Sequence, residues 1–494
     1  MRPTVILRSV ADMTLANAER VAFDRAEVQI SEVATERIAA GRLRFESFMQ
    51  DKGGYVYGST TAPGSRAKRI LSAEDSLRQG VTLRKLIPLQ PGAGGGWLPD
   101  RCVRLAVFAR LSNALTGSGK LRVSTVRAVA SLLNQPPPVP MQATACSGEV
   151  MPLAWLAAPL GDLPLGMGEA MALINGSPFA TAMASDVALT AARRLRLAEW
   201  IFVRSVDAAA CPAAHFDRRL ADGWRDPFYE RSLQRLNELL GDSKRTELDH
   251  QAPTCWRVLP NVLAEALRAV DAASQAAQIG LESLKDNPTF IQADHAEDDV
   301  VLSSGGYHDH RAAKSIDAVN SALLDLSVLA SRQVCHLLDG RLGLPPLLSS
   351  AEDGVGMEYL AWGMTEPLAT AARAAQPTTL EVGLQDPAGN QSDVSSLGFV
   401  AYGKHREVAR AFDACLATLA VTVARALNIR GGLEVDPCGE AQFLRQIRHW
   451  VDSTGRAVDI VGEPVRQAKE LIRTCAEEIP ASRFAESLTR DARA

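Results

Sequence analysis

Ala145–Leu153, which reads Ala-Cys-Ser-Gly-Glu-Val-Met-Pro-Leu, is the most informative stretch of this 494-residue chain. It places a serine and a glycine between a small residue and an acid, directly before an apolar run. On its own, a Ser-Gly pair is an ordinary turn former, and the simplest interpretation of an isolated Cys-Ser-Gly is a loop. The rest of the chain therefore decides whether this stretch carries chemistry.

A tight backbone turn at Cys146-Ser147-Gly148 permits an internal condensation. The amide nitrogen of Gly148 attacks the carbonyl carbon of Cys146 to close a five-membered ring, and the loss of two waters turns Ser147 into an exocyclic methylidene. The product is 4-methylidene-imidazol-5-one (MIO), an electrophile. Glycine is required at the third position because a side chain would hinder the nitrogen. The first residue contributes only backbone atoms, so cysteine is admissible, and the triad predicts an autocatalytic cofactor.

Further segments extend the pattern that the triad begins. In chain order they are Val56–Gly64, Glu169–Ser177, Asp286–Pro288, Ser303–His308, Arg341–Pro345 and Asn390–Gly398. Together with the triad, these segments resemble the histidine, phenylalanine and tyrosine ammonia-lyases, the MIO-dependent aromatic amino acid ammonia-lyase family. The resemblance runs from about Met13 to about Gly432, and several collinear motifs are much harder to obtain by chance than one.

The resemblance implies a mainly all-α fold, the ammonia-lyase (fumarase/aspartase-like) long-helix bundle. The composition agrees, because Ala, Leu and Arg are abundant and aromatic residues make up only 5% of the chain. After Pro260, apolar residues recur at helical spacing within 262–270, 316–337 and 408–427. Up to about residue 200, Gly and Pro interrupt the chain, so we expect short helices joined by irregular loops there.

We expect three parts along the chain: an N-terminal domain with the tyrosine loop and the MIO segment (1–200), a central long-helix bundle (201–432) and closing C-terminal helices (433–494). The three long amphipathic helices of the second half leave apolar surface that partner subunits would cover. This agrees with the homotetramer that the resemblance implies.

The composition also narrows the class of protein. A net charge of -4 without a large basic patch argues against binding to nucleic acid. The eight cysteines are scattered, with no Cys-x-x-Cys pair, which is typical of a reduced chain without a disulfide or zinc framework. The apolar run after Met1 is too short for a signal peptide, and no uninterrupted apolar stretch reaches the length of a membrane span. We expect a soluble cytoplasmic protein that does not bind membranes.

Two local motifs are similar to sites of other kinds. Gly117-Ser118-Gly119-Lys120 looks like the end of a phosphate loop, but the first glycine of that motif would fall on Ala114, so we expect a turn that ends a helix. His308-Asp309-His310 has no third ligand spaced nearby. The sequence therefore predicts neither a metal nor a nucleotide.

The resemblance implies catalytic roles for three side chains outside the triad. Tyr57 stands where the family has a loop tyrosine that removes the β-proton of the substrate, a task that requires the site to make the phenol more acidic. Asn175 corresponds to an amide that supports the MIO carbonyl or the substrate. Arg257 corresponds to an arginine that clamps the substrate carboxylate through two parallel hydrogen bonds. Without the resemblance, a turn tyrosine, a turn asparagine and a surface arginine are the alternatives.

The residues expected to bind the substrate are Leu89, Gln90, Gln251, Thr254, Tyr307 and Ser392. Leu89-Gln90 occupies the pair that sets substrate choice in the family, where phenylalanine lyases often show Phe-Leu, tyrosine lyases His-Leu and histidine lyases Ser-His. Gln90 offers a hydrogen bond to a ring substituent, while Leu89 keeps an apolar wall. Tyr307 replaces a phenylalanine beside the MIO, and core packing is its alternative role.

The chain also departs from the family at the predicted site. Gln251 begins a segment that resembles Gln-Asp-x-Tyr-Ser-x-Arg, in which Thr254 replaces a second active-site tyrosine. Ser392 replaces the Glu of histidine lyases or the Gln of phenylalanine lyases, which argues against histidine as the substrate. Pro63 lies in the tyrosine loop and should stiffen a segment that normally moves.

The sequence predicts an ammonia-lyase that eliminates ammonia from an aromatic or related α-amino acid to give an α,β-unsaturated acid. Two alternatives stay open. One is a 2,3-aminomutase that uses the same cofactor and returns the amine to the β-carbon. The other is a degenerate lyase-fold protein without MIO chemistry, which the residues at Thr254 and Ser392 suggest.

Overall fold

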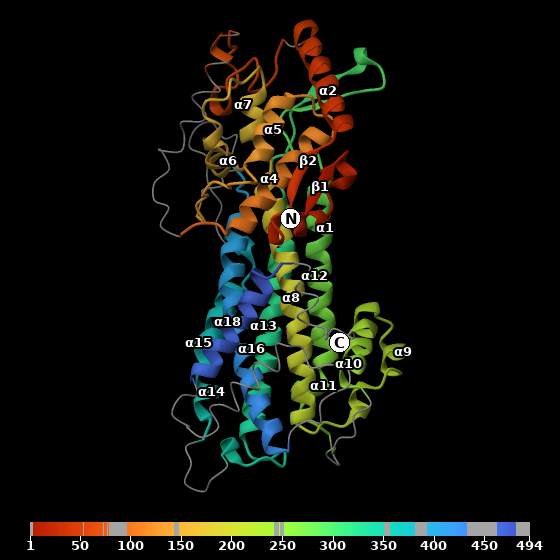
Figure 1. Ribbon diagram of the computed structural model, residues 1–494, viewed down its shortest axis with the longest axis vertical. Helices are drawn as coiled ribbons and strands as arrows, with labels where there is room; N and C mark the ends of the chain where they lie inside the picture. The colour runs from red at the N-terminus through yellow and green to blue at the C-terminus, as the bar shows by residue number, and fades with distance from the viewer. Residues whose placement is uncertain are drawn as a thin grey trace. The chain divides into compact units, whose positions relative to one another are not determined.

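The computed structural model of the protein describes residues 3–52, 54–72, 74–76, 78, 96–142, 148–241, 247, 251–349, 356–380, 393–431 and 462–480. Among these residues helices dominate, and the strands form two short two-stranded sheets (Figure 1). The predicted mainly all-α fold class is confirmed. The predicted site residues Leu89, Gln90, Cys146, Ser147 and Ser392 lie outside the described residues.

The chain forms two compact units. Unit 1 comprises residues 1–188, 273–316 and 377–403, and unit 2 comprises residues 189–272, 317–376 and 404–494. The boundaries between them fall inside four long helices, namely α8 (Pro178–Ala208), α12 (Leu259–Glu282), α13 (His310–Leu338) and α16 (Gly398–Ile429). Each of these helices therefore contributes to both units. The three-part division expected from the sequence follows chain order and stays a prediction.

Unit 1 holds both sheets of the described residues. Its remaining helices are α1 (Leu15–Phe23), α2 (Glu32–Asp51), α4 (Asp100–Leu115), α5 (Val123–Ser131), α6 (Val150–Ala157) and α7 (Glu169–Ile174). Its 3-10 turns are η1 (Val10–Asp12), η2 (Gly64–Arg66), η4 (Ala158–Leu160), η6 (Ala296–Asp298) and η8 (Thr378–Leu380). Strand β1 (Thr4–Leu7) pairs in parallel with β2 (Glu27–Ile30), and β3 (Thr289–Ile291) pairs antiparallel with β4 (Val300–Leu302).

Unit 2 is helical throughout its described residues. Besides the long helices it contains η5 (Ala213–Phe216), α9 (Leu220–Trp224), α10 (Pro227–Leu240), α11 (Thr254–Arg257), η7 (Pro346–Leu348), α14 (Glu358–Trp362), α15 (Thr365–Ala374) and α18 (Gly462–Glu477). The bundle is joined by polar contacts between its helices. Arg194 of α8 makes a paired hydrogen bond with Asp413 of α16 at 2.8 and 3.0 Å, and it also bonds Glu477 of α18.

The predicted apolar runs coincide with α12, α13 and α16. The periodic residues of α13 are all buried: Ile316, Val319, Leu323, Leu326, Ala330 and Leu337. The same holds for most of the run in α16. Of the periodic residues predicted in α12, Leu263 and Ala266 are buried, and Val262, Leu267 and Val270 are half-buried. The expectation of short helices before residue 200 is wrong for α2 and α8, because α8 has no glycine or proline from Phe179 to Ala208 to interrupt it.

Two further features bear on the sequence predictions. Helix α4 ends at Leu115, and Gly117 and Gly119 follow with positive φ, so the segment that looks like a phosphate loop is the predicted helix-ending turn. Helix α16 is long and apolar enough, with a mean hydropathy of 1.4, to cross a membrane. However, 72% of its apolar window is buried inside the protein, as in the core helix of a soluble protein.

Replacing Asp413 with alanine tests the buried ion pair. Arg194 and Asp413 each expose 1% of their side chains, so Asp413→Ala leaves a buried guanidinium with one of its two carboxylate partners missing. We expect the free energy of unfolding to fall by about 3 kcal/mol. Urea unfolding followed by circular dichroism measures the change. The exposed pair of Arg78 and Glu74 is the control, since Glu74→Gln should cost less than about 0.5 kcal/mol.

Candidate active site

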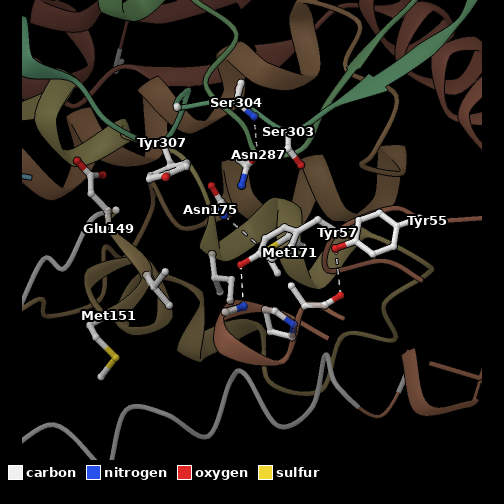
Figure 2. Close-up of a pocket in the computed structure, with 17 residues that line it drawn as sticks. Tyr55, Tyr57, Glu149, Met151, Met171, Asn175, Asn287, Ser303, Ser304 and Tyr307 are labelled. Carbon is white, nitrogen blue, oxygen red and sulfur yellow. Dashed lines mark hydrogen bonds between the residues drawn. The ribbon is translucent and has the colours of Figure 1, made fainter. Parts of the chain in front are cut away.

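A cavity of about 670 Å³ lies in unit 1 (Figure 2). Its walls come from four segments that are far apart in the sequence: the loop from Tyr55 to Ala67, Gly148–Met151, Met171–Asn175, and the loops from Asn287 to Tyr307. The volume suits a ligand the size of an amino acid. Four of the predicted site residues, Tyr57, Gly148, Asn175 and Tyr307, are thereby brought to one pocket.

The tyrosine loop is held in a fixed path. The backbone N–H of Gly64 donates to the hydroxyl oxygen of Tyr57 at 2.8 Å, and the Val56 N–H donates to Thr60 Oγ1 at 2.7 Å. Gly58 has a φ of +67°, and a β-carbon there would lie 2.3 Å from Cε of Met171. No larger residue fits at this position. Tyr57 thus presents its hydroxyl group in a fixed position at the pocket wall.

A second wall of the pocket contains Gly148, the last residue of the Cys-Ser-Gly triad, and Glu149. A β-carbon on Gly148 would lie 3.1 Å from Cδ2 of Tyr307, so the tyrosine ring packs directly against the glycine. The buried Glu149 carboxylate accepts hydrogen bonds from the backbone N–H groups of Phe179 and Ala180, both at 2.7 Å. These groups lie in the first turn of α8, where the helix dipole favours an anion. Glu149 therefore ties the residue after Gly148 to a long helix.

Burial and hydrogen bonding act on Glu149 in opposite directions. Burial raises the pKa of its carboxyl to about 8, while the two backbone hydrogen bonds and the charge of Lys285 oppose the rise. Burial therefore dominates, and this carboxyl exchanges its proton close to neutral pH.

Asn175 follows α7 and presents an amide to the pocket, between Tyr307 and Met171 in Figure 2. Its Nδ2 lies 3.6 Å from Sδ of Met171, and its backbone carbonyl accepts a hydrogen bond from Arg110 at 2.6 Å. Its side-chain Oδ1 is buried and accepts no hydrogen bond from the described residues. Since a buried polar atom without a partner is costly, this oxygen is suited to receive a donor from a ligand.

The opposite wall is built from the loops on either side of the β3–β4 hairpin. Asn287 Oδ1 accepts the backbone N–H of Ser304 at 2.9 Å, which links the two loops. Ser303 and Ser304 are exposed at the rim, and Tyr307 is half-buried beside Gly148. The pocket thus combines aromatic and thioether surfaces with a few amide and hydroxyl groups, as ligand pockets do.

The other predicted residues that the structure describes lie in unit 2. Gln251, Thr254 and Arg257 are exposed and are not among the residues that line the pocket. Arg257 donates to the carbonyl of Ala252 at 2.9 Å and to Thr254 Oγ1 at 3.4 Å. Their roles at the site stay predictions.

The sequence analysis missed several residues that line the pocket. Met171 and Asn287 lie in segments that it singled out, but neither residue was assigned a role. Tyr55 lies in a segment of bends and turns, where no strand or helix periodicity indicates which side chains face inward. Glu149 was recognised as an acid after glycine, and its burial under α8 depends on contacts with residues 30 positions away.

A family model described as aromatic amino acid lyase matches residues 13–163 and 160–449. The chain belongs to the aromatic amino acid lyase family. The predicted class of enzyme, a carbon–nitrogen lyase, is confirmed with it. Among the curated proteins of this family, the histidine ammonia-lyase of Caldanaerobacter subterraneus subsp. tengcongensis is 24% identical over 515 residues, covering 97% of both chains. That of Vibrio cholerae is 26% identical over 436 residues, covering 80% of this chain and 83% of its own.

Solved structures give the same fold at lower identity. Ergothionase from Treponema denticola, described as an ergothioneine-degrading enzyme, has a TM-score of 0.84 at 18% identity, over 95% of this chain and 99% of its own. Tyrosine aminomutase from Streptomyces globisporus has a TM-score of 0.80 at 21% identity, over 97% and 98%. Histidine ammonia-lyase from Trypanosoma cruzi has a TM-score of 0.78 at 20% identity, over 96% of both chains. The predicted ammonia-lyase bundle is confirmed as the fold of the chain.

Replacing Glu149 with glutamine tests the electrostatics of the helix anchor. The folded-state pKa is about 8, and the unfolded-state value is about 4.3. The contribution of this group to stability is therefore fully present below pH of about 4.3 and is lost as the pH rises toward about 8. We expect the midpoint of thermal unfolding to fall between pH of about 6 and 8 more steeply in the wild type than in Glu149→Gln.

Glu169 provides a matched control for this experiment. Burial raises the pKa of Glu169, but hydrogen bonds from Arg122 and Thr125 outweigh it, and the pKa is lowered overall. This carboxyl is ionised in both the folded and unfolded states near neutral pH, so Glu169→Gln should leave the slope unchanged. Equal slopes for the wild type and Glu149→Gln would contradict the interpretation of Glu149.

Proposed function

We propose that the protein is an ammonia-lyase that eliminates ammonia from an aromatic or related α-amino acid and gives an α,β-unsaturated acid. The observation that carries the proposal is the pocket in which Tyr57, Asn175 and Tyr307 surround Gly148, the third residue of the triad. This arrangement places a base, an amide and an aromatic wall around the predicted electrophile. Membership in the aromatic amino acid lyase family supports the reaction class.

The residues around Gly148 fit an MIO formed from Cys146-Ser147-Gly148. The Tyr307 ring packs against Gly148, so a ring cofactor formed there would lie beside an aromatic face. Glu149 anchors the peptide that follows Gly148 to α8. The Oδ1 of Asn175, which accepts no hydrogen bond from the described residues, lies in the same pocket. The MIO would supply the electrophile that makes the substrate amine a leaving group.

The side chains of the pocket account for the remaining parts of the reaction. Tyr57 is the base that takes the β-proton, because its hydroxyl oxygen already accepts an N–H and lies at the pocket wall. Asn175 orients the bound substrate or the cofactor carbonyl through its amide. Met151, Met171 and Tyr307 provide the apolar surface against which an aromatic side chain packs.

The remaining roles are assigned to the predicted site residues other than those that line the pocket. Arg257 is assigned to the substrate carboxylate and Gln251 and Thr254 to its neighbourhood, while Leu89, Gln90 and Ser392 are assigned to the substrate side chain. The active assembly is a homotetramer in the cytoplasm. Support for these roles comes from the position of each residue within segments that resemble the family.

Replacing Ser147 with alanine tests the cofactor. Because the serine hydroxyl is eliminated when the ring forms, the wild-type chain should be lighter than its sequence by the mass of two waters, and Ser147→Ala should have the full mass. Intact-mass spectrometry measures this difference. Cys146→Ala is the matched control, since the first residue contributes only backbone atoms and the chain should still mature. A fully active Ser147→Ala would contradict the proposal.

The same preparations identify the substrate. Ammonia and acrylate release are measured with phenylalanine, tyrosine and histidine. Trimethylamine and acrylate release are measured with ergothioneine, which is included because Treponema denticola ergothionase shares the fold. A β-amino acid that accumulates before any acrylate identifies an aminomutase. A chain of full mass without activity identifies a lyase-fold protein without this chemistry.

Replacing Tyr57 with phenylalanine tests the base. The variant keeps the ring but loses the oxygen, so we expect kcat to fall by about 10²–10⁴ with KM changed little. Steady-state ammonia release measures both constants. Tyr359→Phe is the control, because Tyr359 is 53% exposed on α14 in unit 2. A Tyr57→Phe variant with the kcat of the wild type would assign the proton transfer to another group.

A further inference from the structure

A buried ammonium group lies behind the pocket. Lys285 follows the end of α12, and only 7% of the residue is exposed. Its Nζ donates a hydrogen bond to Thr181 Oγ1 of α8 and lies 3.4 Å from Asp309 Oδ2. Removing a charge from water costs several kcal/mol, so a lysine in this position needs partners in a fixed arrangement.

The surroundings are shaped to hold this lysine. A β-carbon on Gly280 of α12 would lie 2.9 Å from Lys285 Nζ and 2.8 Å from Thr181 Oγ1. A glycine inside a helix is less favourable than an alanine, and here it makes room for the ammonium group. The side chain of Asn113 binds the Lys285 backbone on both sides, donating to its carbonyl at 2.7 Å and accepting its N–H at 3.0 Å.

Lys285 connects the segments that line the pocket. Through Thr181 it contacts the first turns of α8, which bind Glu149, the neighbour of Gly148. Its carbonyl oxygen would lie 2.5 Å from a β-carbon on Gly176, the residue after Asn175.

The lysine reaches the opposite wall of the pocket as well. Its partner Asp309 is two residues beyond Tyr307, and the next residues of its own chain lead to Asn287 in the pocket. Three walls of the pocket, which include Gly148, Asn175 and Tyr307, are therefore connected through one residue, two by the ammonium group of Lys285 and the third by its backbone carbonyl.

The charges near Glu149 come from several elements. The carboxyl faces Lys285, Asp309 and the buried Arg110 of α4, besides the two N–H groups of α8. Asp309 also lies 3.7 Å from the exposed Arg311. Burial lowers the pKa of Lys285, and the negative charges of Asp309 and Glu149 oppose this change. Both carboxylates thus favour the charged form of Lys285, and Lys285 favours the charged form of Glu149, whereas the negative charge of Asp309 opposes the ionisation of Glu149.

We propose that Lys285 is a positioning residue of the active site, whose ammonium group holds the Glu149, Thr181 and Asp309 elements together and thereby fixes Gly148 against Tyr307. The proposal rests on the proposed function for its catalytic consequence. Its structural part, the rigidity of the pocket wall, is independent of that function. Lys285 contacts no reacting atom and acts through the residues that do.

Lys285→Met is the principal test, because methionine fills a similar volume without the charge. In the holoenzyme we expect kcat to fall at least about tenfold, because a small misplacement of reacting groups is costly, with KM changed less than about threefold. Without its cation, Glu149 should hold its proton to higher pH, so the acid limb of the pH profile of kcat should move upward. Lys314→Met is the control, since Lys314 is exposed on α13 in the same unit.

Adding Asp309→Asn to Lys285→Met separates positioning from stability. The double variant removes both charges of the pair, so its unfolding midpoint should return toward that of the wild type. This measurement is possible even if Lys285→Met alone fails to fold. The kcat of the double variant should stay low because the ammonium contact with Thr181 is still missing. Recovery of kcat together with stability would overturn the proposal, as would a folded Lys285→Met with a kcat and a pH profile like those of the wild type.

Hydrogen exchange gives a readout that does not depend on activity. Amides in peptides covering 148–157 and 303–309 should exchange at least about tenfold faster in Lys285→Met than in the wild type or Lys314→Met. Unchanged exchange overturns the proposal. If the wild-type chain has its full mass and releases no ammonia, the proposed function fails, and the exchange experiment still decides the role of Lys285.

Discussion

The pocket depends on the hydrogen bonds from the first turn of α8 to the Glu149 carboxylate. They join the residue after Gly148 to a 31-residue helix, and they do so in a buried place where an unpaired carboxyl would be costly. The neighbouring Thr181 bonds Lys285, which in turn pairs with Asp309. The tyrosine loop packs against the Met171–Asn175 wall through the close approach of Gly58 to Met171.

The long helices and the motif order could be predicted from the sequence, because both are local properties. Apolar spacing located α13, and the matching segments gave the ammonia-lyase fold. The chemistry behind the pocket could not be predicted, because Lys285 in the sequence is an ordinary lysine after an amphipathic helix. Its burial depends on Gly280, Thr181 and Asp309, which are adjacent only in the folded chain.

The pocket offers a substrate both aromatic surface and polar groups. Tyr55, Tyr57 and Tyr307 offer aromatic surface and hydroxyl groups, and Asn287, Ser303 and Ser304 form a polar rim. The sequence located Tyr57, Asn175 and Tyr307 because they belong to segments with a recognisable pattern. It also assigned substrate choice to Leu89 and Gln90, but this pair matches none of the family's patterns and therefore does not identify the amino acid.

The anchor of Glu149 also has a consequence for the order of events during synthesis. Gly148 is held in place only after the ribosome has produced the first turn of α8, 30 residues later, and the supporting lysine follows more than a hundred residues after that. A nascent chain that ends before Lys285 lacks the frame around the triad. Any backbone reaction that requires a rigid Gly148 is thereby delayed until unit 1 has folded, which protects an incomplete chain from carrying a reactive group.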